Sequence, residues 1–192
     1  MFPRQRLDGL GDAIYGVSMT LLVLDIRIPD TAHATTSAEF LRLLHTLWPH
    51  ILPYVISFGV LSSGWLSSIR VTHRHATFPR AYVAWWRPQL LLVTATPFTT
   101  MTVARFSTVP LAVALYATNI GLVSLCAWRM LAVTDAEDAD AVAERRAGLI
   151  QLMMLSLLAI VISPWLGAWA LVAYLLKRVP LRRLRKTGPV DA

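Results

Sequence analysis

Residues 6–29, RLDGLGDAIYGVSMTLLVLDIRIP, restrict most strongly how this chain can fold. The stretch is apolar enough to enter a membrane, yet only a dozen uncharged residues separate Asp12 from Asp25. A helix surrounded by lipid needs about 20 predominantly apolar residues to cross the bilayer. Charged residues in membrane segments usually face protein or water. We therefore interpret residues 9–28 as the first membrane span and as the wall of a pore.

The composition of the whole chain is typical of a membrane protein. Of its 192 residues, 56% are hydrophobic and 15% are charged, whereas a soluble domain has about 25% charged residues. Spans need nearly the whole chain, so we expect no sizeable soluble domain, and no signal-peptide cleavage site follows the first apolar run. The net charge of +7 indicates basic cytoplasmic loops rather than a nucleic-acid partner.

Hydropathy predicts an all-α protein with a single domain over residues 1–192 and six membrane spans. The expected spans are residues 9–28, 47–69, 82–103, 109–131, 146–163 and 164–177. The last two are short, and only a tight turn at Ser163-Pro164-Trp165 separates them.

The distribution of Lys and Arg predicts that both termini face the cytoplasm. With the N-terminus inside, every Lys and Arg falls in an inside segment except Arg27, Arg42 and Arg105, in agreement with the positive-inside rule. We interpret the acidic stretch 134–146 as a solvated connector or as the exposed start of the fifth helix, with a cation-attracting vestibule as the alternative. The basic C-terminal tail is interpreted as a topology anchor, with binding to anionic lipid as the alternative.

No catalytic or cofactor-binding motif occurs in the sequence. GxGxxG, P-loop, HExxH, CxxC and GxSxG patterns are absent, as is a TVGYG-like filter. His73 and His75 alternate in a basic loop, which we interpret as a connector rather than a metal site. We therefore expect no enzyme activity, no cofactor and no bound metal beyond a permeating ion.

The helical periodicity of the first span gives it two different faces. One face carries a stripe of Val17, Thr20, Leu21, Leu24 and Ile28. The opposite side carries the small residues Gly11, Gly16 and Ser18, which would let a neighbouring helix approach closely. Such a stripe is usually core or lipid-facing surface, but the charged flanks argue against lipid and Thr20 adds a hydroxyl. Several copies around an axis would form a narrow apolar constriction with one polar ring.

The charged residues at the two ends of the span have simpler interpretations. Arg6 and Asp12 are expected to pair and to anchor the helix at the inner interface, with direct ion contact by Asp12 as the alternative. An unpaired carboxylate at the membrane edge would be costly. Asp25 and Arg27 are expected to mark the outer mouth.

The first span resembles the first helix of the transmembrane protein 175 family of potassium channels. The family signature, Arg, three residues and Phe-Ser-Asp, stands here as Arg6, Leu7-Asp8-Gly9 and Leu10-Gly11-Asp12, followed by TLLVLDIRIP. The resemblance extends to Tyr54, Ser57, Phe58 and Trp65, to Pro97-Phe98, to PLAVALYATN and to Ser163-Pro164-Trp165. The departures are Leu10 and Gly11 for Phe and Ser, Ser67-Ser68 for a His, and a small Val17.

This resemblance implies six-helix subunits that assemble, in bacteria, as homotetramers with four first helices lining the pore. Counted from the signature Asp, the constriction falls on Val17, with further apolar layers on Leu21 and Leu24. The hydroxyl linked to potassium preference falls on Thr20. The resemblance thus implies passive potassium conduction across the bacterial inner membrane, without a cofactor.

We therefore expect a potassium-selective or weakly selective cation channel. The alternative is a secondary transporter or proton-coupled cation exchanger that uses Asp12, although the broken-helix pairs and inverted halves common in transporters are absent. A membrane enzyme or a structural scaffold is less favoured, because no catalytic constellation is found.

Overall fold

The computed structural model describes residues 2–28, 34–69, 77–134 and 139–176, and these are almost entirely helical. The helices are α1 (Arg4–Leu21), α2 (Ser37–Thr46), α3 (Trp48–Ile69), α4 (Arg80–Arg105), α5 (Pro110–Ala132) and α6 (Ala139–Leu166). Two 3₁₀ segments, η1 (Leu22–Asp25) and η2 (Gly167–Leu176), continue α1 and α6. Two short strands, β1 (Phe2–Pro3) and β2 (Thr77–Phe78), pair antiparallel.

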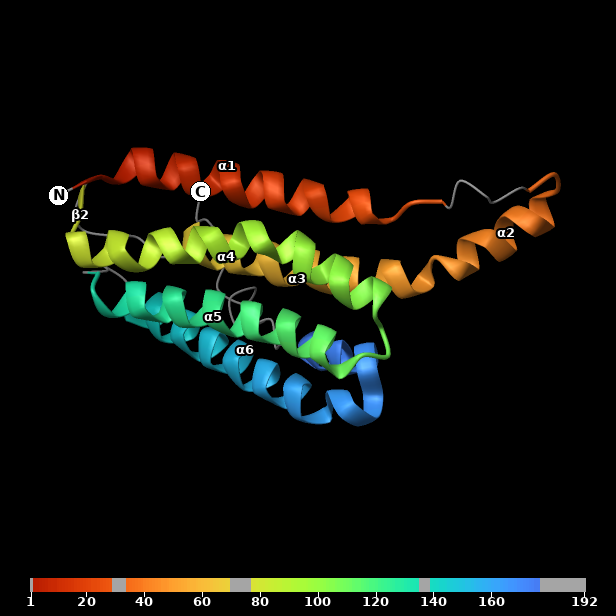
Figure 1. Ribbon diagram of the computed structural model, residues 1–192. Coiled ribbons are helices and arrows are strands. Elements are labelled where there is room, and N and C mark those ends of the chain that lie inside the picture. Colours follow the sequence, from red (N-terminus) through yellow and green to blue (C-terminus); the bar gives the residue numbers. More distant parts are fainter. Residues whose placement is uncertain (1, 29–33, 70–76, 135–138, 177–192) are drawn as a thin grey trace, which may run out of the picture.

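The long helices lie side by side in three layers (Figure 1). Helix α1 forms one outer layer, α3 and α4 form the middle layer, and α5 and α6 form the other outer layer. The most extensive packing joins α4 to α5 and α5 to α6. Helix α2 projects beyond the end of this bundle. Consequently, α1 sits at the edge of the subunit, with one side on the middle layer and the other side open.

The main core lies between α3, α4, α5, α6 and η2, and buried hydroxyl groups cross it. Tyr116 is fully buried, and its ring meets Tyr174 edge-on at 5.8 Å between centroids. Ser57 donates a hydrogen bond to the Tyr116 hydroxyl at 3.1 Å and lies 2.8 Å from the Thr100 hydroxyl. Because buried polar groups are costly without partners, these bonds allow α3, α4 and α5 to pack closely.

Four helical stretches are long and apolar enough to cross a membrane, judged by length and composition. They are residues 4–25, 48–69, 110–132 and 139–175. Helix α4, which holds the expected span 82–103, is not among them. Its sequence contains two prolines and several threonines, whose hydroxyls bond to carbonyl oxygens one turn earlier, as Thr96 does to Leu92. The count of six spans therefore stays a prediction.

The turn after the fifth expected span lies later than predicted. Helix α6 runs through Ser163-Pro164-Trp165 to Leu166, and the chain bends at Gly167, whose φ is +53°. The backbone N–H of Ala168 donates to the carbonyl of Ser107 at 2.7 Å, which fixes the bend against the α4–α5 connection. Only glycine adopts this backbone conformation without strain, so Gly167 rather than Pro164 sets the position of the turn.

Helix α2 was not expected from the sequence. It begins with a capping box, in which the Glu39 backbone N–H donates to the Thr36 hydroxyl and the Glu39 carboxylate accepts from the Thr36 backbone N–H. The Thr35 backbone N–H also donates to this carboxylate, at 2.8 Å, and holds the pKa of Glu39 below its usual value. The helix buries no residue of its own.

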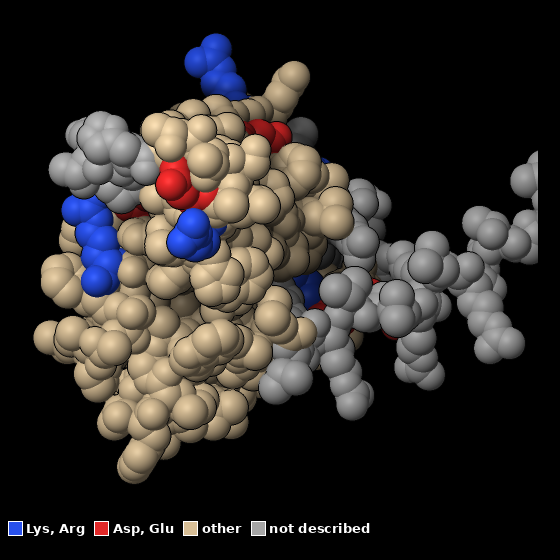
Figure 2. All heavy atoms as spheres, turned by 90° about the vertical axis from the view of Figure 1, so that its right-hand side faces the viewer, with Lys and Arg blue, Asp and Glu red and all other residues tan. Residues whose placement is uncertain are grey.

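Charge is unevenly distributed at the end of the bundle where α2 projects. Figure 2 shows that end, where the part formed by α5, α6 and η2 presents uncharged side chains and the charged ones gather toward α1 and α2.

The start of α6 holds residues 139–146 of the acidic stretch. His73, His75 and the basic tail lie outside the described residues.

Candidate functional site

Helix α1 buries one face against the rest of the subunit. Its packing partners are α3 and α4, as Figure 1 also shows. Tyr15 of α1 and Leu22 of η1 form a cluster with Leu61 of α3 and Val93 of α4. This cluster fixes the rotation of α1, because turning the helix would expose two large apolar side chains.

Small residues on this buried face permit the close packing. Gly11 is buried, and a Cβ atom added there would lie 3.8 Å from the indole nitrogen of Trp86. Ser18 is only 1% exposed. Gly16 has open space around its Cα and takes no part in this contact. Of the three small residues on the side expected to face a neighbouring helix, Gly11 and Ser18 thus lie buried in the packing.

The opposite face of α1 carries the predicted stripe, and it is open. Val17 is 57% exposed, Leu21 44% and Leu24 56%. Leu10 lies two turns before Val17 and is also exposed. One subunit leaves these apolar side chains uncovered. They therefore face lipid, contact another subunit or line a pore.

Thr20 lies in the middle of the exposed stripe. Its hydroxyl donates a hydrogen bond to the backbone carbonyl of Val17 at 2.8 Å. With its proton engaged in the helix, the hydroxyl oxygen keeps its lone pairs for a group outside the helix. The stripe therefore presents one polar oxygen between apolar side chains.

Asp12 is held by a partner that the sequence did not indicate. Its Oδ1 atom accepts a hydrogen bond from the indole N–H of Trp65 at 2.8 Å, which ties α1 to α3. The two residues are 53 positions apart, so no local pattern could pair them. The resemblance had drawn attention to both residues, but separately.

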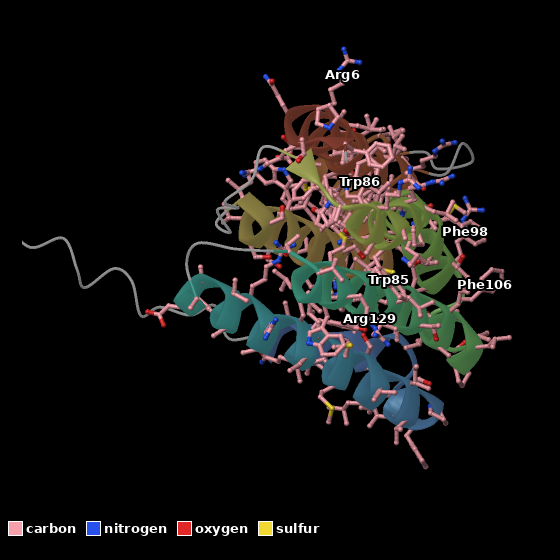
Figure 3. All side chains as sticks on the ribbon, turned by 90° about the vertical axis from the view of Figure 1, so that its left-hand side faces the viewer. Arg6, Trp85, Trp86, Phe98, Phe106 and Arg129 are labelled. Atoms are coloured by element: carbon pink, nitrogen blue, oxygen red, sulfur yellow. The ribbon has the colours of Figure 1, made fainter. Side chains whose placement is uncertain are left out.

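The expected pair of Arg6 and Asp12 does not form within one subunit. Arg6 points away from the bundle, as Figure 3 shows. Six positions along a helix place two side chains on different sides, since each residue turns the helix by about 100°. Instead, Arg4 forms an ion pair with Asp8 one turn later, at 3.0 Å.

At the other end of the stripe, Asp25 turns toward its own subunit. Its carboxylate lies 3.8 Å from the guanidinium of Arg105 on α4 and 3.6 Å from Nδ1 of His50 on α3. Arg27, which was expected to flank the outer mouth together with Asp25, is exposed and donates to the carbonyl of Leu24 at 2.9 Å. Both ends of the exposed stripe are therefore tied to α3, and the outer end also contacts α4.

The N-terminal half of the chain is similar to known channel proteins. Residues 6–97 match the model of a family described as endosomal/lysosomal potassium channel TMEM175. A protein of Chamaesiphon minutus named potassium channel is 31% identical over 101 residues, which cover 53% of this chain and 49% of that protein. A protein of Streptomyces collinus with the same name is 29% identical over 101 residues, which cover 53% of this chain and 48% of that protein. The match thus spans about half the length of these curated relatives.

The fold is similar over a longer stretch. The crystal structure of a lysosomal potassium-selective channel TMEM175 homolog from Chamaesiphon minutus matches 88% of this chain and 90% of its own chain. The TM-score is 0.69, and the sequences are 24% identical. The chain therefore has the fold of that channel subunit, and the resemblance to the transmembrane protein 175 family is confirmed.

Proposed function

We propose that this chain is one subunit of a potassium channel. Its residues 6–97 match the TMEM175 family model, and its fold is similar to that of a TMEM175 homolog. The names of the two curated relatives support potassium as the ion. In this proposal, four copies assemble around an axis with their α1 helices innermost. Potassium crosses passively, and the chain holds no cofactor.

The two-faced packing of α1 is the observation that carries this proposal. One face is buried against α3 and α4, while Val17, Leu21 and Leu24 stay open at the edge of the subunit. A stripe at the edge of one subunit is in position to meet its copies around an axis, and closed rotational symmetry is the common arrangement of homo-oligomers.

The side chains of the stripe have distinct roles in this pore. Rings of Val17, Leu21 and Leu24 form an apolar constriction, which blocks ions when it is dry and conducts when it is wetted. A ring of Thr20 oxygens contributes polar ligands to a partly dehydrated cation, because each hydroxyl proton is bonded to the Val17 carbonyl. Leu10 lies on the same side of α1, nearer the N-terminal mouth.

Asp12 has a structural role in this proposal. Its hydrogen bond to Trp65 holds the N-terminal part of α1 against α3. A transporter or proton-coupled exchanger that uses Asp12 is the competing function, and it would need this carboxylate to bind and release its cargo in each cycle. Steeply pH-dependent, saturating flux is the signature of that function.

The proposed location is the bacterial inner membrane, with both termini in the cytoplasm. The arrangement of Lys and Arg supports this orientation. Arg4 and Arg6, near the beginning of α1, then lie at the cytoplasmic surface, and Asp25 lies at the outer surface.

The test is the reversal potential of the purified protein in a planar bilayer, with potassium on one side and sodium on the other. A large shift toward the potassium equilibrium potential is expected. Current without a shift would contradict potassium selectivity and leave a cation pore. Slow, saturating flux with a steep pH dependence would contradict the channel and favour the exchanger.

A further inference from the structure

A second feature of the subunit lies behind α1, on the side away from the exposed stripe. There a cavity of about 290 Å³ is lined by residues of α1, α3, α4, α5 and the beginning of α6. Its polar lining includes Asp12, Tyr15, Trp65, Tyr82, Gln89 and Arg145. It lies at the end of the bundle where α1 begins, which Figure 3 shows from the outside.

Arg145 is the group in this cavity that lacks a partner. Its Nε atom is buried and has no hydrogen-bond acceptor among the described residues. No carboxylate in the described part of the chain lies within ion-pair distance of it, even though Asp8 and Asp12 line the same cavity. An arginine in a protein stays charged, and a buried charge without a partner is strongly destabilising.

The other charges of the cavity are already engaged. Asp8 is paired with Arg4 at 3.0 Å, and Asp12 accepts the Trp65 indole N–H at 2.8 Å. Gln89 directs its amide toward the Tyr15 hydroxyl, at 3.5 Å. Asp12 and Arg145 are thus the two charges of this lining without an opposite charge within ion-pair distance, and they differ in that the Asp12 carboxylate accepts a hydrogen bond whereas Arg145 Nε has no partner among the described residues. An anion is the ligand that would supply Arg145 with both a counter-charge and an acceptor.

The guanidinium, the volume and the aromatic lining of the cavity favour a phosphate group. A planar guanidinium binds phosphate through two parallel hydrogen bonds, and the volume exceeds that of one phosphate. Trp65, Trp86 and Tyr82 surround the site, and such aromatic residues gather at the depth of lipid headgroups. Basic pockets between membrane helices bind anionic headgroups.

We propose that this cavity binds a phosphate group, with Arg145 as its counter-charge. The phosphate belongs either to the headgroup of an anionic phospholipid or to free inorganic phosphate. Because Tyr15 of α1 lines the same cavity and its hydroxyl can donate a hydrogen bond, the bound anion would also brace α1 from behind. The bracing of α1 matters only if α1 lines the proposed pore, whereas the binding site itself does not depend on the proposed function.

Binding is measured on the purified full-length protein, without any measurement of ion flux. Thermal unfolding is followed in phosphatidylcholine vesicles with added inorganic phosphate, with chloride of equal ionic strength as the control. A second series replaces part of the phosphatidylcholine by phosphatidylglycerol. Native mass spectrometry then counts the phosphatidylglycerol molecules retained per subunit. Stabilisation by the lipid alone identifies the headgroup as the source, and stabilisation by free phosphate alone identifies the soluble anion.

The matched variants are Arg145→Gln and Arg146→Gln, because Arg146 is the exposed neighbour on the same helix. Arg145→Gln should weaken binding about tenfold or more, since it removes a charge-assisted contact, and Arg146→Gln should bind like the wild type. If Arg145→Gln does not fold, Arg145→Lys is used instead, and it should bind more weakly than the wild type. The proposal is overturned if neither phosphate source stabilises the wild type beyond chloride. It is also overturned if every folded Arg145 variant binds like the wild type.

Discussion

Among single residues, Val17 is the position at which a substitution best tests whether the exposed stripe lines a pore. In the proposed pore, replacing Val17 by Asn should wet the constriction and raise potassium flux roughly tenfold, the effect of lowering a barrier by about 1.4 kcal/mol. The side chain is 57% exposed, so the subunit should still fold. Flux into vesicles and the reversal potential are the measurements.

The matched control for this variant is Val161→Asn on α6. Val161 is 62% exposed and lies on the outer layer opposite α1, so the same substitution there should leave flux unchanged. Equal flux and ion preference in Val17→Asn and the wild type would show that Val17 does not line the pore.

At the scale of secondary-structure elements, Gly167 joins α6 to η2. A Cβ atom at this position would lie 2.5 Å from the Ser107 carbonyl oxygen, and the residue has a positive φ. Gly167→Ala should therefore lower the free energy of unfolding by about 1–3 kcal/mol. Thermal unfolding of the purified protein checks this. The control is Gly148→Ala, within α6 and with open space around it, which should be neutral or slightly stabilising.

Helix α2 depends on the ionised Glu39 carboxylate in its capping box. Hydrogen bonds from Thr35 and Thr36 lower the pKa of Glu39 in the folded state. Its stabilising contribution is therefore fully present above the ordinary pKa of 4.5 and is lost as the pH falls through the lower, folded value. Amide exchange of residues 37–46, corrected for the intrinsic rate, should show α2 opening only in acid.

The control variant for this element is Glu39→Gln. Glutamine can occupy the same position of a capping box, but its side chain does not titrate in this range. The acid-induced opening of α2 should therefore disappear in this variant. Identical pH profiles for the wild type and Glu39→Gln would mean that another group controls α2.

At the scale of the whole molecule, Arg6 should act between subunits. It points away from its own bundle (Figure 3), and its expected partner Asp12 is bonded to Trp65. Arg6→Ala should therefore leave the helical content unchanged and shift the proposed tetramer toward smaller species. Light scattering on the purified protein and circular dichroism test this, with Arg146→Ala on α6 as the control. A folded tetramer with normal flux would exclude Arg6 from assembly.

Much of the candidate site could be predicted because it depends on local periodicity. The stripe of Val17, Thr20 and Leu21 follows from helical spacing, and the structure leaves these residues open on the side of α1 away from its packing. The prediction that Arg6 pairs with Asp12 was wrong for a single subunit, because helical geometry places the two side chains on different sides of α1. Helix α2 was missed, although Thr36 and Glu39 form a capping-box pattern that could have indicated its start.

The helical membrane-protein class, the helical periods and the two-faced character of α1 follow from the order of the residues alone, since hydropathy and spacing are properties of neighbouring residues. Which distant groups meet depends instead on how the helices pack. Trp65 reaches Asp12 from another helix, Arg105 and His50 reach Asp25, and Arg145 enters the cavity behind α1. Charged and polar groups in a helical bundle take their partners from adjacent helices, and packing rather than sequence order determines which helices are adjacent.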